Sequence, residues 1–151
     1  MLDRERGCDF VGIEKEQALK VFTQGGNCCQ AVLAAFCEKY DLPLKQAMRL
    51  AAGLGGGVKC GEICGTVSAA AIVVGLKYGA ESAEKPEVKM LCTEKTREIT
   101  DAFRSRHGSL ICRALLAKGS MVMPGEKING HEPICFTLVE DAVNILKERE
   151  Y

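Results

Sequence analysis

An amphipathic segment in the N-terminal part of the chain decides the fold class: residues 27–40 read NCCQAVLAAFCEKY. Its apolar side chains recur at positions i, i+3, i+4, i+7 and i+11, which are Cys29, Val32, Leu33, Phe36 and Tyr40. Because an α-helix has about 3.6 residues per turn, this spacing places them on one face. Asn27 precedes the segment, and asparagine is a favoured N-cap residue. The stretch therefore predicts a helix over 28–40 that packs against other helices.

Helical patterns continue along the rest of the chain, and no convincing strand pattern interrupts them. The predicted helices cover 13–24, 28–40, 43–53, 62–77 and 87–106, with a short helix from 109 and a last one from about 135. Glycine- and proline-rich stretches, 53–57 and 118–133, separate them. Residues 1–12 are a loose lead-in, and 13–151 form one domain. We therefore predict an all-α, single-domain bundle of about six to seven helices.

The composition argues against several classes of protein. Lysine plus arginine and aspartate plus glutamate each count 20, so the formal net charge is zero. Nucleic-acid-binding modules usually carry a basic excess, and attraction to anionic membranes requires one as well. The longest apolar run, 64–76, is too short to span a bilayer. No signal peptide is visible in the charged first ten residues. We expect a cytoplasmic protein that binds neither nucleic acid nor membranes.

Nine cysteines are the most unusual feature of the composition. An odd number cannot pair completely within one chain, and in a reducing compartment cysteines more often serve metal binding or redox chemistry. Four of them lie at predicted helix starts: Cys28, Cys64, Cys112 and Cys135. A helix N-terminus carries partial positive charge and free N–H groups, which stabilise a thiolate over a thiol. We therefore predict one site where several helix ends meet.

The spacing of these four cysteines excludes local metal motifs. They are widely dispersed, unlike the Cys-x-x-Cys pairs of zinc ribbons or the tight run of bacterial ferredoxins. Among the other cysteines, Cys29 is predicted to be a core residue because it lies in the apolar stripe. Cys60 lies four residues before Cys64, close enough to pair with it or share a metal. His131 precedes Cys135 by four residues and is an alternative ligand.

Several segments together resemble the C_GCAxxG_C_C family of redox-active proteins. Residues 27–32 (NCCQAV) are similar to the family's Asn-Cys-Ala-Gln-Ala-Val, and 61–70 (GEICGTVSAA) are similar to its Gly-Glu-x-Cys-Gly-Ala-Val-Ser-Gly-Ala. The glycine-rich 51–57, the Cys-Arg-x-Leu-Leu match at 112–116 and the last cysteine complete the likeness. The likeness covers most of the chain, and it is specific because these segments occur together.

The resemblance implies a helical, dimeric, redox-associated protein. It places the family's four characteristic cysteines at Cys28, Cys64, Cys112 and Cys135. The chain is also similar to the region of split-Soret cytochromes that is associated with an iron–sulfur cluster. It departs from the family pattern in four places: Thr66 and Ala69 replace alanine and glycine, and Cys29 and Cys60 are additional cysteines.

Three functions remain open from the sequence. The first is an iron–sulfur protein for electron transfer or sensing, whose metal and cofactor ligands are Cys28, Cys64, Cys112 and Cys135, since all-thiolate sets suit such clusters. The second is a metal-free protein that cycles a disulfide, with Cys60 and Cys64 as its dithiol. The third is a structural zinc protein or a helical scaffold. We expect a homodimer with an unidentified redox partner, and no residue is assigned a catalytic role.

Overall fold

Seven α-helices make up the part of the chain that the computed structural model describes, which is the backbone of residues 2–151 and the side chains of residues 12–151. In chain order they are α1 (Leu2–Thr23), α2 (Cys28–Phe36), α3 (Leu44–Ala51), α4 (Gly65–Tyr78), α5 (Pro86–His107), α6 (Cys112–Val122) and α7 (Pro133–Glu148). A 3-10 turn, η1 (Cys37–Tyr40), continues α2, and an irregular turn, η2 (Gly57–Gly61), precedes α4. The described residues contain no strand, so the predicted all-α, single-domain bundle is confirmed.

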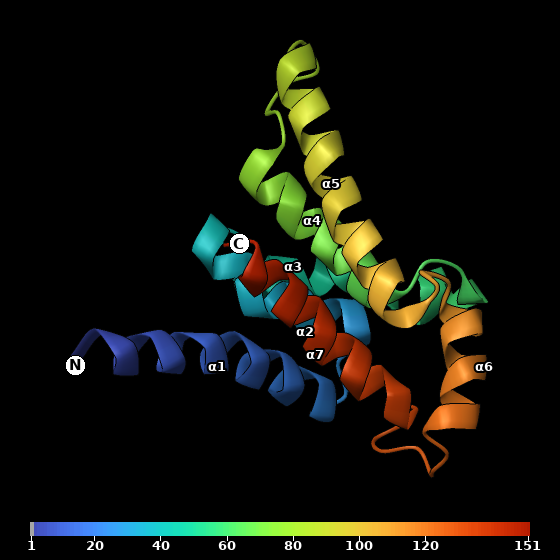
Figure 1. The fold of residues 1–151 in the computed structure, drawn as a ribbon. Helices are drawn as coiled ribbons and strands as arrows, with labels where there is room; N and C mark the ends of the chain where they lie inside the picture. Colours follow the sequence, from blue (N-terminus) through green and yellow to red (C-terminus); the bar gives the residue numbers. More distant parts are fainter. Residues whose placement is uncertain (1) are drawn as a thin grey trace.

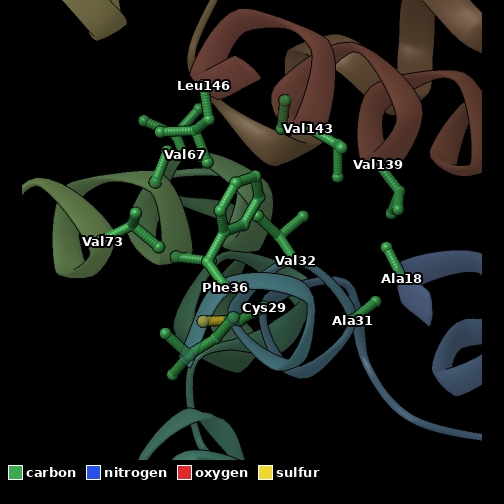
Figure 2. Packing of buried hydrophobic residues seen from close by; sticks show 14 of the residues in the cluster. Ala18, Cys29, Ala31, Val32, Phe36, Val67, Val73, Val139, Val143 and Leu146 are labelled. Carbon is green, nitrogen blue, oxygen red and sulfur yellow. The ribbon is translucent and has the colours of Figure 1, made fainter. Parts of the chain in front are cut away.

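The hydrophobic core lies between α1, α2, α4 and α7. Figure 2 shows Val32 and Phe36 of α2 among side chains of α4 and α7, and both are buried. Cys29 is fully buried in the same cluster, which confirms its prediction as a core residue. Burying one large apolar side chain contributes about 1.5–3 kcal/mol, so packing holds the short α2 in place more than intrinsic helix propensity does.

The remaining helices pack around this core. α4 and α5 form an antiparallel pair whose far ends extend away from the rest of the bundle (Figure 1). The C-terminal end of α5 returns to α7, where His107 Nε2 lies 2.9 Å from an Asp141 carboxylate oxygen. α6 then leads the chain from the end of α5 to the loop before α7 (Figure 1). Within the described residues, no helix has the length and apolar character needed to cross a bilayer.

The first helix is longer than predicted. α1 begins at Leu2, whereas the sequence predicted a start near residue 13 after a loose lead-in. The lead-in contains good helix formers and no proline, so no residue in it forces the helix to stop. The side chains of residues 1–11 lie outside the described part. The separation of 1–12 from a domain of 13–151 therefore stays a prediction.

Two helix starts and several helix ends also differ from the prediction; α2 ends at Phe36 and not at residue 40, because a 3-10 turn follows, and α3 ends at Ala51 and not at residue 53. α4 begins at Gly65 and not at residue 62, because Ile63 pairs with Ile111 in an antiparallel bridge. The same bridge delays α6 to Cys112, so Ser109 is not its N-cap; the Ser109 hydroxyl accepts a hydrogen bond from the Ile111 N–H at 3.0 Å. α6 then continues to Val122, through a stretch that was predicted to be loop.

Candidate functional site

The four cysteines at predicted helix starts line one cavity of about 330 Å³. They lie where α2, α4, α6 and α7 begin: Cys28 is the first residue of α2, Cys64 the N-cap of α4, Cys112 the first residue of α6 and Cys135 the third residue of α7. Apolar side chains line the cavity with them: Phe22, Leu115, Leu116 and Leu138. The prediction that these cysteines meet where helices begin is therefore confirmed, whereas their role as ligands stays a prediction.

Asn27 fixes the start of α2 and therefore the position of Cys28. Its side-chain oxygen accepts a hydrogen bond from the Gln30 N–H at 2.8 Å, and the Gln30 side chain accepts one from the Asn27 N–H at 2.9 Å. This is the reciprocal capping box that satisfies two free N–H groups at a helix start. The Asn27 amide also donates to the carbonyls of Ala51 and Ala52, both at 3.1 Å. The first turn of α2 is thereby tied to the end of α3.

Cys64 and Cys112 are positioned against each other by backbone hydrogen bonds. The Cys64 N–H donates to the Leu110 carbonyl at 2.8 Å, and the Cys112 N–H donates to the Glu62 carbonyl at 2.6 Å. This pair of bonds brings the starts of α4 and α6 together, although the two cysteines are far apart in the sequence. The Arg113 guanidinium also pairs with the Glu62 carboxylate at 2.5 Å, on the exposed side of this junction.

Cys28 Sγ is surrounded by hydrogen-bond donors. The Cys64 thiol donates to it, and so do the backbone N–H groups of Gly56, Cys29 and Gly65. The Cys64 hydrogen bond, together with these N–H groups, outweighs the effect of burial and lowers the pKa of Cys28 from 9.0 to about 6. Hydrogen bonds to the charged form are one of the ordinary means by which a protein stabilises a thiolate. These donors therefore favour the thiolate form of Cys28.

The close approach to Cys28 requires a glycine at the start of α4. A Cβ atom at Gly65 would overlap Cys28 Sγ and would lie 3.0 Å from the Leu54 carbonyl oxygen. A Cβ at Gly57, whose φ is +63°, would lie 2.9 Å from the Cys112 Cβ. Both glycines therefore allow neighbouring backbone to approach the thiols, and Gly65 is part of the segment that resembles the family pattern.

The other three thiols of the cavity stay protonated. The hydrogen bond to the Cys28 thiolate is the largest cause that raises the pKa of Cys64, followed by burial and repulsion from the same thiolate. Burial, together with the charge of Cys28, raises the pKa of Cys135 to about 12 and also raises that of Cys112. Of the four thiols, Cys28 is thus the one whose surroundings favour the thiolate form.

Thr66 is a site residue that the sequence did not single out. It is fully buried, and its hydroxyl is 3.1 Å from Cys64 Sγ, within hydrogen-bonding distance. This hydrogen bond lowers the pKa of Cys64 and so opposes the larger effects of Cys28 and burial. The one signal in the sequence was that Thr66 stands where the family pattern has alanine.

The sequence also singled out Cys60 and His131, and only His131 lines the cavity. Cys60 is exposed, donates to the Gly57 carbonyl at 3.3 Å and does not line the cavity, so the thiol that meets Cys64 is Cys28. His131, which precedes Cys135 by four residues, lines the cavity and its ring stacks on Phe22 with centroids 3.7 Å apart. Burial lowers the pKa of His131, and its Nε2 has no hydrogen-bond partner in the described part of the chain.

The metal-binding capacity of this cavity can be judged from its donors. Four thiols suit iron–sulfur chemistry or zinc, because both prefer thiolate ligands. However, no three histidine, cysteine, aspartate or glutamate side chains within residues 12–151 are grouped closely enough to hold one metal ion. The chemistry of the donors therefore fits a metal centre, whereas their arrangement in this structure does not form a site for a single ion.

One comparison with known proteins gives a match. The model of the family described as "Putative redox-active protein (C_GCAxxG_C_C)" matches residues 26–149 of the 151-residue chain. This range includes all four cysteines of the cavity. No curated protein and no solved structure matches the chain.

Proposed function

This chain belongs to the C_GCAxxG_C_C family of redox-active proteins, and from that premise we propose that it is a thiol–disulfide redox protein. Cys28 is the attacking thiolate, and Cys64 is the thiol that resolves the mixed disulfide. The observation that carries this proposal is the set of hydrogen bonds to Cys28 Sγ from the Cys64 thiol and three backbone N–H groups. Because the thiolate is the nucleophile of disulfide exchange, a cysteine that ionises near pH 6 is reactive at neutral pH.

The reaction takes two exchange steps and needs a disulfide as its oxidant. The Cys28 thiolate attacks one sulfur of that disulfide, its S–S bond breaks, and half of it leaves as a thiolate. Cys64 then loses its proton and attacks Cys28 Sγ, which forms the Cys28–Cys64 disulfide and expels the second half as a thiol. The two cysteines lose two electrons in total, and the oxidant gains both.

The structure supports a fixed order for these two steps. While Cys28 is a thiolate, it is the main cause of the raised pKa of Cys64. Formation of the mixed disulfide removes that negative charge, so the pKa of Cys64 falls. Cys64 therefore becomes a nucleophile only after Cys28 has reacted, which keeps the two roles distinct.

The experiment follows which thiols react and how many are lost. A Cys60→Ser variant serves as the background, since it removes the one thiol that is exposed among residues 12–151. The reduced protein is treated with 2-hydroxyethyl disulfide at pH 7, and its peptides are identified by mass spectrometry. We expect the loss of two thiols per chain and a Cys28–Cys64 disulfide. In the same background Cys64→Ser should trap a mixed disulfide on Cys28, and Cys28→Ser should abolish fast oxidation.

Cys92→Ser in that background is the matched control, because Cys92 is half-buried and lies away from the cavity. It should oxidise as the background protein does. The proposal is wrong if Cys28 reacts no faster than Cys92, or if the disulfide that forms does not include Cys28 and Cys64.

Iron–sulfur binding is the second candidate function, and the convergence of four thiols on one cavity favours it. Cys28, Cys64, Cys112 and Cys135 would hold the cluster, which would supply one-electron transfer when bound. Each cysteine of a four-iron cluster binds a different iron, so a cluster accepts a wider spacing of thiols than a zinc ion does. The N–H groups around Cys28 Sγ would hydrogen-bond its sulfur and raise the reduction potential.

Anaerobic purification separates the two candidates. The sample is assayed for iron, zinc and acid-labile sulfide, and its ultraviolet–visible spectrum is recorded. Iron, sulfide and charge-transfer bands that disappear in Cys112→Ser and Cys135→Ser would establish the cluster. The dithiol proposal instead expects a colourless protein in which both of these variants still form the Cys28–Cys64 disulfide. We further expect a cytoplasmic location, where other thiols would return the protein to its reduced form.

A further inference from the structure

The mouth of the cysteine cavity carries two lysines. The lining residues that are freely exposed to solvent are Gly56, Lys59, Lys127 and Gly130. Glu132 is the remaining charged residue of the lining apart from the cysteines, and its carboxylate is 3.5 Å from Lys127 Nζ. These two charges largely cancel. By contrast, Lys59 has no acidic partner within ion-pair distance among the described residues.

Lys59 reaches this position through an unusual backbone. Four consecutive residues, 56–59, have left-handed φ values between 57° and 63°. Glycine accepts this region freely, whereas the backbone of Val58 and Lys59 is strained there. The turn also leaves the Val58 side chain 50% exposed. The turn supplies the Gly56 N–H that faces Cys28 Sγ, its Gly57 carbonyl accepts from the Glu62 N–H at 3.0 Å, and it also places Lys59 at the cavity mouth.

The inner end of the cavity combines the Cys28 thiolate with the N-terminal ends of four helices. The N-terminal ends of α2, α4, α6 and α7 all face it through their cysteines. Each N-terminal end carries partial positive charge, and N–H groups around Cys28 Sγ already hold one anion there. An incoming molecule with negative groups therefore meets Lys59 at the mouth and helix dipoles further in.

We propose that the oxidant of Cys28 is a small disulfide with carboxylate groups near its S–S bond, and that Lys59 selects it. This inference rests on the proposed function and names the substrate class of the same site. The Cys28 thiolate attacks the nearer sulfur, the S–S bond breaks, and the departing thiolate takes the electron pair. Lys59 holds a carboxylate of the substrate during this step, and Cys64 then displaces the remaining half as described above.

The experiment compares three disulfides of different charge: oxidised glutathione is anionic, 2-hydroxyethyl disulfide is neutral and cystamine is cationic. Rates of Cys28 oxidation are measured in the Cys60→Ser background. Each is divided by the rate of the same disulfide with 2-mercaptoethanol thiolate, which corrects for intrinsic reactivity. We expect the normalised rate to be highest for oxidised glutathione and lowest for cystamine, and the preference to weaken in high salt.

Substitutions of Lys59 test its role directly. Lys59→Asn removes the charge but keeps a residue that tolerates left-handed backbone. It should lower the ratio of the glutathione rate to the neutral-disulfide rate roughly threefold to tenfold. Lys59→Arg should retain the ratio, and so should Lys45→Gln, which alters an exposed lysine on α3 away from the cavity.

The outcomes separate the two proposals. If Cys28 reacts with all three disulfides in the proportions of the reference thiolate, or if Lys59→Asn leaves the ratio unchanged, the assigned substrate class is wrong and the thiol–disulfide function stands. If none of the three disulfides oxidises Cys28, both proposals are wrong.

Discussion

At the scale of single residues, the chemistry of this cavity depends on one proton shared between two thiols. Cys28 and Cys64 are the same residue type in the same cavity, yet the pKa of Cys28 is lowered and that of Cys64 is raised. The difference comes from the local donors, because three backbone N–H groups face Cys28 Sγ. Cys64 is therefore the donor in their shared hydrogen bond.

The first prediction concerns the ionisation of Cys28. The rate of Cys28 alkylation by iodoacetamide, followed on its own peptide, should rise with pH to a midpoint near 6, which is its lowered pKa. In Cys64→Ala the midpoint should move toward 9, because the largest cause of the lowered pKa is removed. A midpoint near 9 in the unaltered protein would contradict the assignment of Cys28 as the thiolate.

A second prediction at this scale concerns Thr66. Thr66→Val keeps the shape of the side chain and removes the hydroxyl that lies 3.1 Å from Cys64 Sγ. Since that hydrogen bond lowers the pKa of Cys64, its loss should slow the resolving step about threefold to tenfold. The mixed disulfide on Cys28 should last correspondingly longer in quenched samples, whereas alkylation of Cys28 should keep its midpoint. Equal lifetimes in both proteins would refute this role.

At the scale of secondary structure, the site is built from the first residues of helices. An N-terminal turn offers N–H groups that no carbonyl of the same helix accepts. Here one such group, the Gly65 N–H at the start of α4, donates to the thiol of a different helix, α2. The contact requires that residue 65 lack a side chain, because a Cβ there would overlap Cys28 Sγ.

Two glycines of α4 give a matched pair of variants for this contact. Gly65→Ala should destabilise the fold by about 1–3 kcal/mol through the overlap and should raise the pKa of Cys28 as its thiol moves away. A Cβ at Gly75 meets no atom within 4 Å, so Gly75→Ala should leave that pKa unchanged and stabilise the helix by up to about 1 kcal/mol. For each variant, urea unfolding measures the change in stability, and the pH profile of alkylation measures the pKa of Cys28. Similar effects of the two substitutions would disprove the role of Gly65.

At the scale of the whole molecule, the shifted thiols make stability depend on pH. Between pH 6 and 9 the folded protein has lost the Cys28 proton, whereas the unfolded chain still binds it. The free energy of unfolding therefore rises with pH in this window, by roughly 1.4 kcal/mol per pH unit for this group. Above pH 9 the sign reverses, because Cys29 and Cys135, with pKa values raised to about 12, keep protons that the unfolded chain releases.

Urea unfolding of the reduced protein at a series of pH values tests this dependence. The difference in unfolding free energy between the unaltered protein and Cys28→Ser should increase from pH 6.5 to 8.5. Taking the difference removes the contributions of His107 and His131, whose lowered pKa values also affect stability at acidic pH. A difference that does not change with pH would show that Cys28 has the same pKa in the folded and unfolded states.

The homodimer implied by the family resemblance is the remaining prediction at this scale. Sedimentation equilibrium of the reduced protein should give twice the chain mass of 16.3 kDa. A mass equal to that of one chain would contradict it.

Short-range patterns in the sequence predict that the chain is helical and that four of its cysteines lie near helix starts. Residues 28–40 carry an apolar stripe of helical period, so local spacing predicts that they are helical, although the α-helix changes to a 3-10 turn at Cys37. Asn27 and Gln30 cap that helix through bonds that also span only three residues. Asparagine, glycine and proline mark helix ends in the same local way, which explains why Cys28, Cys64 and Cys135 could be placed at helix starts. Cys112 was placed from Ser109, but α6 begins at Cys112 because of the bridge between Ile63 and Ile111.

Which of these residues meet, and what each can do, depends on how the helices pack together. The spacing left open whether Cys60 pairs with Cys64 or is a free loop thiol; in the structure Cys60 is exposed, and the thiol that faces Cys64 is Cys28 on another helix. The start of α4 also shifted to Gly65, because its preceding residues bond to the distant start of α6. A thiol's pKa depends on which donors lie around its sulfur, and those donors come from separate parts of the chain. Local spacing therefore predicts the elements, whereas their packing selects the reactive thiol.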